Sequence, residues 1–265
     1  MAFLQGSYFS EELLQEVHFT CIRPFENQKE EAQEKYLILL HGLMDNSNAW
    51  ILKTNLYRLA EEYGVTVFCP EGHRSCYCDM KYGGKYRRML IKEIPRVMKG
   101  LLGCELNGKN TVIAGNSAGG LGALKAVLSP DSLYRKCMAF SPVVHPEKAL
   151  RDIPESYLIA GEERAIFGEA LKIPQEENPA ELLKDERLKN KFPLQITISC
   201  GTEDFLLAQN REFQKALAES GVSVTYREAA GEHGWEYWEN HLKELFEEYF
   251  RSVYKELHAD RETGC

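Results

Sequence analysis

The sequence predicts an α/β fold in which a mainly parallel sheet carries helices on both faces. From residue 36 onward, short apolar runs of strand length alternate with amphipathic runs of helix length, a pattern typical of βαβ units. One such strand, Thr111–Ala114, runs directly into Gly115-Asn-Ser-Ala-Gly119 and then into a helical run, Leu121–Leu128. This direct succession of strand, sharp turn and helix places Ser117 at the carboxyl edge of the predicted sheet.

The N-terminal part of the chain predicts one edge of this sheet. Phe3–Ser10 and Leu14–Pro24 are β-type segments, and we expect them to form an antiparallel pair. A charged loop is expected at Asn27–Lys35. The continuous apolar run Tyr36–Leu40 fits a strand buried on both faces of a parallel sheet, and Val65–Cys69 fits the next strand.

Apolar spacing and flanking glycine or proline residues predict the remaining elements. The predicted helices span Asn55–Tyr63, Tyr86–Leu102, Phe205–Ser220 and Trp235–Leu257. The predicted strands span Lys136–Ser141, Leu194–Cys200 and Val222–Arg227. Pro95 lies inside the second of these helices and predicts a kink or a late restart there, because proline has no backbone N–H to donate.

The alternation of strands and helices is interrupted once. Between Val143 and about Lys191, prolines, charged residues and short helical pieces replace it. We interpret this stretch as an insertion that covers the active-site end of the sheet. Residues 1–265 are therefore predicted to form a single domain with a cap-like insertion at about 143–191.

Composition and charge narrow the classes of partner. The 265 residues are 44% hydrophobic, and the formal net charge of -8 at pH 7 argues against nucleic acid and anionic membranes. No apolar stretch has the length of a membrane span, and Met1–Ser7 lacks the features of a signal peptide. We expect a cytoplasmic protein that acts on a small-molecule substrate, and homo-oligomer formation is left open.

Eight cysteines raise the alternatives of disulfides and of a metal site. Several lie inside predicted core strands, and in the absence of a signal peptide we expect reduced thiols. The cluster with candidate metal ligands is Cys76-Tyr-Cys78, with His73 close by. No second Cys/His pair has matching spacing, so a loop that lines a pocket is the preferred interpretation, and neither a metal nor another cofactor is expected.

The glycines on either side of Ser117 have a mechanical reason. Gly115 and Gly119 each lie two residues from the serine, where a Cβ atom would collide with the neighbouring strand or helix. The start of the following helix favours a developing negative charge. G-x-S-x-G also occurs by chance in glycine-rich loops, so the alternative is a turn without chemistry. The flanking strand and helix favour a nucleophile elbow.

An acid and a histidine follow the serine in the order that this type of site requires. Asp204 follows the predicted strand Leu194–Cys200, and His233 lies in the loop after Val222–Arg227. Both positions are at strand ends, where sites of α/β proteins are built. Glu203 is the rival acid, a helix N-cap is the alternative role of Asp204, and a surface histidine is the alternative for His233.

The predicted chemistry is that of a serine hydrolase. A serine hydroxyl is a poor nucleophile until imidazole takes its proton, and the carboxylate fixes the imidazole tautomer. Stabilising the oxyanion requires two backbone N–H groups. We expect one from Ala118, directly after the serine, and the other from Leu43, in the loop after the first buried strand.

The chain resembles, along nearly its whole length, the tributyrin esterase group of the esterase D family, which includes S-formylglutathione hydrolases. The motifs that carry the resemblance are Leu39-Leu-His-Gly-Leu43, Ala49-Trp50, Gly115-Asn-Ser-Ala-Gly-Gly120, Gly201-Thr-Glu-Asp-Phe205 and Gly231-Glu-His-Gly-Trp-Glu-Tyr-Trp238. The resemblance implies an α/β-hydrolase fold and a triad that hydrolyses short-chain acyl esters without a cofactor. The triad residues would be Ser117, Asp204 and His233.

Two departures from the family pattern concern the pocket. Asn116 and Ala118 stand where relatives usually have leucine and methionine. Relatives carry Asn-Gly-Trp-Tyr-x-Asp where this chain has Ser75-Cys-Tyr-Cys-Asp79. The missing tryptophan is expected to reshape the acyl or alcohol pocket.

Three functions follow from these observations. The first is a carboxylesterase that acts on small acyl esters, with acetyl groups on sugars among the candidates. The second is a thioesterase of the S-formylglutathione hydrolase type, and the third is a hydrolase-fold binding or acyl-transfer protein. Aromatic residues proposed to contact substrate, with core packing as the alternative, are Trp50, Tyr77, Tyr82, Trp235 and Trp238.

Overall fold

The computed structural model describes residues 1–25, 34–148, 153–191 and 193–250. In these residues eight strands form one sheet, in the order β1-β2-β4-β3-β5-β6-β7-β8. The strands are β1 (Ala2–Ser10), β2 (Gln15–Arg23), β3 (Lys35–Leu40), β4 (Val65–Pro70), β5 (Thr111–Asn116), β6 (Lys136–Phe140), β7 (Gln195–Gly201) and β8 (Ser223–Ala229). β1 pairs antiparallel with β2, and β2 with β4, whereas every pair from β4 to β8 is parallel. The predicted mainly parallel sheet with an antiparallel edge is confirmed.

The apolar run of β3 is buried on both faces, as predicted. Tyr36, Ile38 and Leu40 join the core on one face, and Leu37 and Leu39 join the core on the other. Such alternation of neighbouring side chains between two cores requires an apolar residue at every position of the strand. The sheet is therefore the middle layer of the molecule.

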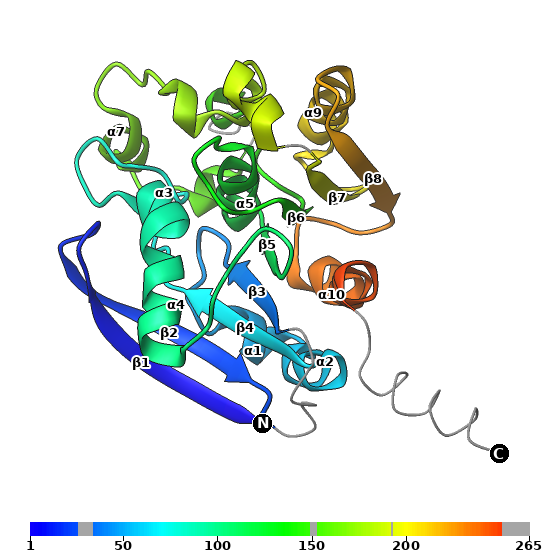
Figure 1. Ribbon diagram of the computed structural model, residues 1–265. Coiled ribbons are helices and arrows are strands. Elements are labelled where there is room, and N and C mark those ends of the chain that lie inside the picture. The colour runs from blue at the N-terminus through cyan, green and yellow to red at the C-terminus, as the bar shows by residue number, and fades with distance from the viewer. Residues whose placement is uncertain (26–33, 149–152, 192, 251–265) are drawn as a thin grey trace.

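Helices cover both faces of the sheet (Figure 1). One face carries α4 (Ile94–Leu102), α5 (Ala118–Leu128) and α9 (Leu207–Glu219). The other face carries α1 (Ala49–Lys53), α2 (Leu56–Tyr63) and α10 (Trp235–Tyr249). Among the helices of the described residues, none has the length and apolar character needed to cross a bilayer.

The structure adjusts several of the predicted helices. The run predicted over Tyr86–Leu102 consists of α3 (Tyr86–Arg88), a π-helical segment η1 (Met89–Glu93) and α4. Pro95 lies in the first turn of α4, where its missing N–H breaks no helical hydrogen bond. The predicted helix Trp235–Leu257 ends earlier, at Tyr249, because Phe250 has an extended backbone. Residues 251–257 and most of the loop predicted over Asn27–Lys35 lie outside the described residues.

The described residues 153–191, between β6 and β7, contain only short helices. They are η2 (Glu155–Tyr157), α7 (Glu162–Phe167), η3 (Gln175–Glu177), α8 (Pro179–Leu182) and η4 (Glu186–Lys191). Backbone hydrogen bonds join α7 to the loop before α3, because the N–H groups of Lys81 and Tyr82 donate to the carbonyls of Ile166 and Ala165. We keep the word cap for this stretch, residues 153–191.

Candidate active site

Ser117 lies at a strained turn between β5 and α5. Its backbone φ is 53° and its ψ is -116°, a conformation that non-glycine residues rarely adopt. A Cβ added to Gly115 would lie 2.6 Å from the carbonyl carbon of Gly119, and one added to Gly119 would lie 2.5 Å from the carbonyl oxygen of Leu40. Only glycine fits at these two positions, so the mechanical reason inferred from the sequence holds in the structure.

The side chains of Ser117, His233 and Asp204 lie in one chain of hydrogen bonds. The distance from His233 Nε2 to Ser117 Oγ is 2.9 Å, and that from His233 Nδ1 to Asp204 Oδ2 is also 2.9 Å. The other oxygen of Asp204 accepts the N–H of Leu206 at 2.8 Å. Asp204 therefore holds the start of the following segment and faces the imidazole at the same time.

The rival acid, Glu203, has other partners. Its Oε2 accepts the backbone N–H of Gly231 at 2.6 Å and the hydroxyl of Thr202 at 2.8 Å. Both hydrogen bonds lower the pKa of the Glu203 carboxyl, and the bond from Gly231 has the larger effect. Glu203 thus holds the loop that carries His233, while Asp204 is the carboxylate in contact with the imidazole.

Aromatic rings surround the imidazole of His233. The ring of Phe205 lies 4.4 Å away between centroids, and Trp238 presents an edge at 5.1 Å. The indole N–H of Trp238 lies 3.3 Å from Ser141 Oγ and donates to it. Only 7% of the His233 side chain is exposed, so the packing restricts the ring to the orientation that reaches both partners.

Trp50 and Tyr77 were predicted to contact substrate, and this prediction is wrong. Each side chain is 1% exposed, which leaves no surface for a substrate. Trp50 Nε1–H donates to the carbonyl of Leu40 at 2.9 Å, and the N–H of His41 donates to the hydroxyl of Tyr77 at 3.0 Å. Both aromatic residues instead hold the loop that follows β3.

The side chain of His41 holds the next peptide of this loop. Its Nδ1 lies 2.7 Å from the carbonyl oxygen of Gly42. A carbonyl only accepts, so Nδ1 carries the proton. The Gly42 carbonyl and the Leu43 N–H belong to the same trans peptide and point in opposite directions. His41 therefore determines where the Leu43 N–H points.

Glu71 and Gly72 support the far side of the His41 ring. Nε2 lies 3.0 Å from Glu71 Oε1 and 2.9 Å from the backbone nitrogen of Gly72. Burial by itself raises the pKa of Glu71, but the close contact with the His41 ring and the hydrogen bonds from the N–H groups of His73 and Ser47 outweigh it. The resulting pKa is about 2. The carboxylate stays charged at any ordinary pH.

The two amides predicted to form the oxyanion hole are free of intramolecular acceptors. In the part of the chain that the structure describes, the N–H groups of Leu43 and Ala118 donate to no backbone or side-chain acceptor. Ala118 is the first residue of α5, where helical N–H groups have no partner in the preceding turn. Both groups are available to a bound oxyanion.

Comparison with known proteins decides the class of this site. Residues 10–249 match the model of a protein family described as "Putative esterase". The chain belongs to this esterase family. An acetyl esterase of Caldicellulosiruptor saccharolyticus is 27% identical to it over 260 residues, which cover 93% of this chain and 97% of that protein. The esterase is thus a serine hydrolase that acts on carboxylic ester bonds, as the sequence predicted.

Two solved structures from Staphylococcus aureus are similar over most of their length. The fluorophosphonate-binding serine hydrolase FphF has a TM-score of 0.82 and 26% identity, covering 92% of this chain and 96% of its own. The S-formylglutathione hydrolase FrmB has a TM-score of 0.79 and 25% identity, with the same coverage. The predicted α/β-hydrolase fold and the family resemblance are confirmed.

A small apolar pocket adjoins Ser117. Two of its lining residues, Leu121 and Val143, donate their N–H groups to the carbonyl oxygen of Ser117 at 3.1 and 3.2 Å. The volume of the pocket is small, about 40 Å³. Apolar side chains from the loop after β3, from α5 and from the cap line it, including Leu43, Leu121, Val143, Ile153, Leu158 and Phe167.

The sequence analysis did not identify the residues of the cap that line this pocket. Leu158 follows η2, and Ile166 and Phe167 lie at the end of α7, so none of them belongs to a long apolar period. The adjacent apolar residues Ile166 and Phe167 in an otherwise charged stretch were the available signal. Cys76 also lines the pocket, as expected for the cysteine-rich loop.

Tyr82 and Trp235, also predicted to contact substrate, do not line this pocket. Tyr82 is 61% exposed. Trp235 packs edge-on against Trp50 at 5.0 Å, and the ammonium of Lys53 lies 4.8 Å from its ring centroid. Their substrate contacts stay predictions.

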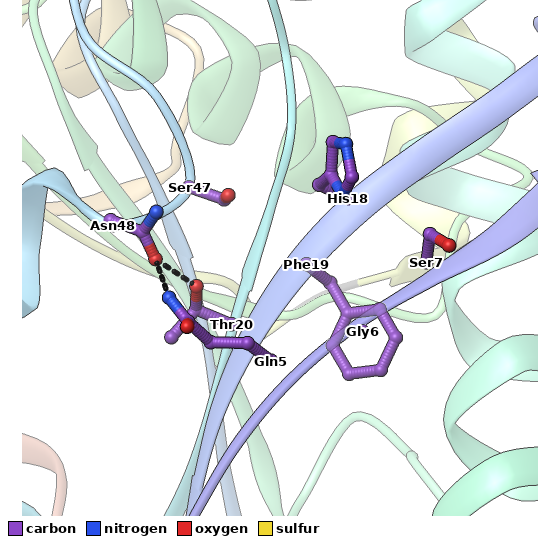
Figure 2. Close-up of a pocket in the computed structure, with 8 residues that line it drawn as sticks. All are labelled: Gln5, Gly6, Ser7, His18, Phe19, Thr20, Ser47 and Asn48. Atoms are coloured by element: carbon purple, nitrogen blue, oxygen red, sulfur yellow. Dashed lines mark hydrogen bonds between the residues drawn. The ribbon is translucent and has the colours of Figure 1, made fainter.

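Figure 2 shows a second pocket of the esterase, between the β1–β2 hairpin and the loop before α1. Gln5 Nε2 and Thr20 Oγ1 donate to Asn48 Oδ1 at 2.7 and 2.6 Å. Polar groups of this pocket therefore satisfy one another. None of the predicted site residues lines it, whereas Leu43 lines the pocket that adjoins Ser117.

The cysteines that the structure describes are free thiols. The thiol of Cys78 lies 3.0 Å from the ammonium of Lys125. Among the described residues, no three or more His, Cys, Asp or Glu side chains are grouped so that they could hold a metal ion. The cysteine-rich loop is thus a structural neighbour of the pocket.

Proposed function

We propose that the esterase hydrolyses short-chain acyl esters, acetyl esters among them, through an acyl-enzyme on Ser117. The observation that carries the proposal is the pair of 2.9 Å contacts from His233, one to Ser117 and one to Asp204. A pocket of small volume lies close to these residues. Nucleophile, base and orienting carboxylate stand in the relation that acyl transfer by serine requires.

In the first half-reaction, Ser117 Oγ attacks the ester carbonyl while its proton passes to His233 Nε2. The Nδ1–H of the imidazole donates to Asp204, which stabilises the imidazolium. The oxyanion of the tetrahedral intermediate accepts the N–H groups of Leu43 and Ala118, and each such donor contributes about 10²–10³ to the rate. His233 then gives the proton to the leaving alcohol, and water repeats the sequence on the acyl-enzyme.

The pocket supports a short acyl group. A pocket of about 40 Å³ suits an acyl chain of few carbon atoms, and the lining is mainly apolar. The relative from Caldicellulosiruptor saccharolyticus is called an acetyl esterase. Acetyl groups on sugars fit this proposal as well as simple alkyl esters, because the pocket limits the acyl part of the substrate.

The direct test is the rate of hydrolysis of p-nitrophenyl acetate. Replacing the nucleophile, Ser117→Ala, is expected to lower turnover by about 10⁴–10⁶. Ser7→Ala, on the exposed edge strand β1, is the matched control and is expected to leave turnover unchanged. Retention of most activity by the Ser117 variant would rule the mechanism out.

A thioesterase of the S-formylglutathione hydrolase type is the second candidate. The similarity to FrmB favours it, since a formyl group also fits the small pocket and a thioester reacts by the same steps. Side-by-side values of kcat/KM on S-formylglutathione and on p-nitrophenyl acetate separate the two. A much larger value on the thioester would make the second candidate the function.

A further inference from the structure

We propose that the ion pair between Arg74 and Glu162 is a specificity-determining wall of the acyl pocket, which excludes long acyl chains and ties the cap to the oxyanion loop. This inference rests on the proposed function. Glu162 begins α7 and lines the pocket. Arg74 lies in the loop after β4, two residues before the pocket residue Cys76.

The contacts of Arg74 join three separate segments. Its Nε and one terminal nitrogen donate to the two carboxylate oxygens of Glu162 at 2.5 and 2.8 Å. The same terminal nitrogen donates to the carbonyl of Tyr157 in the cap at 2.6 Å. The other terminal nitrogen lies 3.5 Å from the carbonyl of Leu43. One guanidinium thus contacts two points of the cap and the loop that supplies the proposed oxyanion donor.

The geometry of the pair makes it rigid. A guanidinium and a carboxylate in a two-pronged arrangement are held more firmly than a single ion pair. The Arg74 side chain is 30% exposed and that of Glu162 12% exposed, so water screens the pair only in part. The cap wall at Glu162 is therefore fixed relative to Leu43.

The charge of the pair explains why this wall would limit acyl length. Most of the other lining residues, such as Leu121 and Val143, are apolar, although Glu163, next to Glu162, also lines the pocket. A longer alkyl chain that reached Glu162 would remove water from a charged pair without supplying a hydrogen bond in return. Short acyl groups avoid this penalty because they end before the pair.

The experiment compares kcat/KM for p-nitrophenyl acetate and p-nitrophenyl octanoate. In the double variant Arg74→Met with Glu162→Leu, the octanoate-to-acetate ratio is expected to rise about tenfold or more, the discrimination that apolar pocket contacts provide. The kcat on acetate is expected to fall, because Leu43 loses its contact with the cap. Glu162→Gln alone, which keeps the shape of the side chain, is expected to give a smaller rise.

A matched control is available elsewhere on the molecule. Arg211 and Glu228 form a two-pronged pair of the same kind, at 2.7 and 2.6 Å, between α9 and β8. Arg211→Met with Glu228→Leu is expected to leave the ratio of rates unchanged. The unfolding temperature of each variant is measured to establish that the variant is folded at the assay temperature. A ratio within twofold of the wild type in the folded Arg74/Glu162 variant would overturn the proposal.

A second measurement separates this inference from the proposed function. Inactivation by fluorophosphonates with ethyl and octyl chains tests the size of the pocket without any ester turnover. If the wild type fails to cleave acetate esters, the proposed function is refuted, and the ratio of the two inactivation rates still tests the pair. A rise in the octyl-to-ethyl ratio in the double variant supports the wall, and an unchanged ratio contradicts it.

Discussion

At the scale of single residues, the site depends on side chains that hold main-chain groups. Trp50 and Tyr77 fix the carbonyl of Leu40 and the N–H of His41, and the imidazole of His41 fixes the carbonyl of Gly42. Large aromatic residues near a catalytic loop suggested stacking against a substrate, and here they hold the loop that carries the proposed oxyanion donor, Leu43. Preorganised donors of this kind need no rearrangement at the moment of reaction.

His41 offers a test at this scale. In His41→Ala the Gly42–Leu43 peptide loses its support, and we expect kcat on p-nitrophenyl acetate to fall by about 10²–10³ with little change in KM. In His41→Asn the amide N–H can take the place of Nδ1–H, so part of kcat should return. An equal fall of kcat in both variants would show that His41 does not orient the Leu43 N–H. A rise in KM with kcat unchanged would show the same.

At the scale of elements, the helix after Ser117 is joined to the cap by a buried ion pair. Lys125 in α5 and Glu177 in η3 lie 2.6 Å apart, with side-chain exposures of 0% and 1%. Burial disfavours both charges, but the neighbouring Cys78 and then Glu177 raise the pKa of Lys125, and Lys125 lowers the pKa of Glu177. The ammonium also donates to the carbonyl of Tyr77 at 2.9 Å. The pair therefore holds together the helix, the cysteine-rich loop and the cap.

Removing one partner of this pair should be costly. Lys125→Met leaves the Glu177 carboxylate buried with its hydrogen bonds from Arg87 and from the Asp79 N–H alone. We expect a loss of about 3–5 kcal/mol in the free energy of unfolding, measured in urea. Lys109→Met, at an exposed lysine, is the control and should change stability by less than about 0.5 kcal/mol. An equal effect of the two substitutions would mean that the buried pair does not anchor the cap.

At the scale of the whole molecule, stability toward acid should depend on Glu71. Its pKa in the folded chain is about 2, below the value near 4.3 of an unfolded glutamate. A lowered folded pKa contributes stability that is present above about pH 4 and is lost as the pH falls toward 2. The side chain is almost fully buried, so this contribution is about 3 kcal/mol.

The free energy of unfolding between pH 6 and pH 2.5 measures this contribution. Glu71→Gln should be less stable than the wild type at pH 6, and the difference should shrink as the pH falls. Glu61→Gln, at an exposed carboxylate, should follow the wild-type curve. A constant difference between Glu71→Gln and the wild type over the whole range would show that the charge of Glu71 is not what stabilises the fold.

The fold and the order of the site residues could be predicted because they depend on local patterns. Strand β3 is apolar at every position since both of its faces are buried, and Ser117, Asp204 and His233 each follow a strand that ends at the same edge. Side-chain direction has no such local signal. Whether Trp50 points into the core or into a pocket depends in part on α10, which comes from a distant part of the chain.

The contacts of the cap could not be predicted for the same reason, since they join residues far apart in the sequence. Arg74 and Glu162 are 88 residues apart in the chain, and neither has a neighbour that marks it as a partner of the other. The helical run with Pro95 shows the opposite case. There the proline's missing N–H predicted a kink or a late restart, and Pro95 lies in the first turn of α4, although the π-helical segment before it depends on packing.

The central claim is that Ser117 is the residue that attacks the ester carbonyl. Labelling the folded enzyme with a fluorophosphonate, followed by peptide mass mapping, tests it most directly. We expect one probe per chain on Ser117, no label in Ser117→Ala, and much slower labelling in His233→Ala. A probe attached to another residue, or equal labelling of the wild type and Ser117→Ala, would contradict the account.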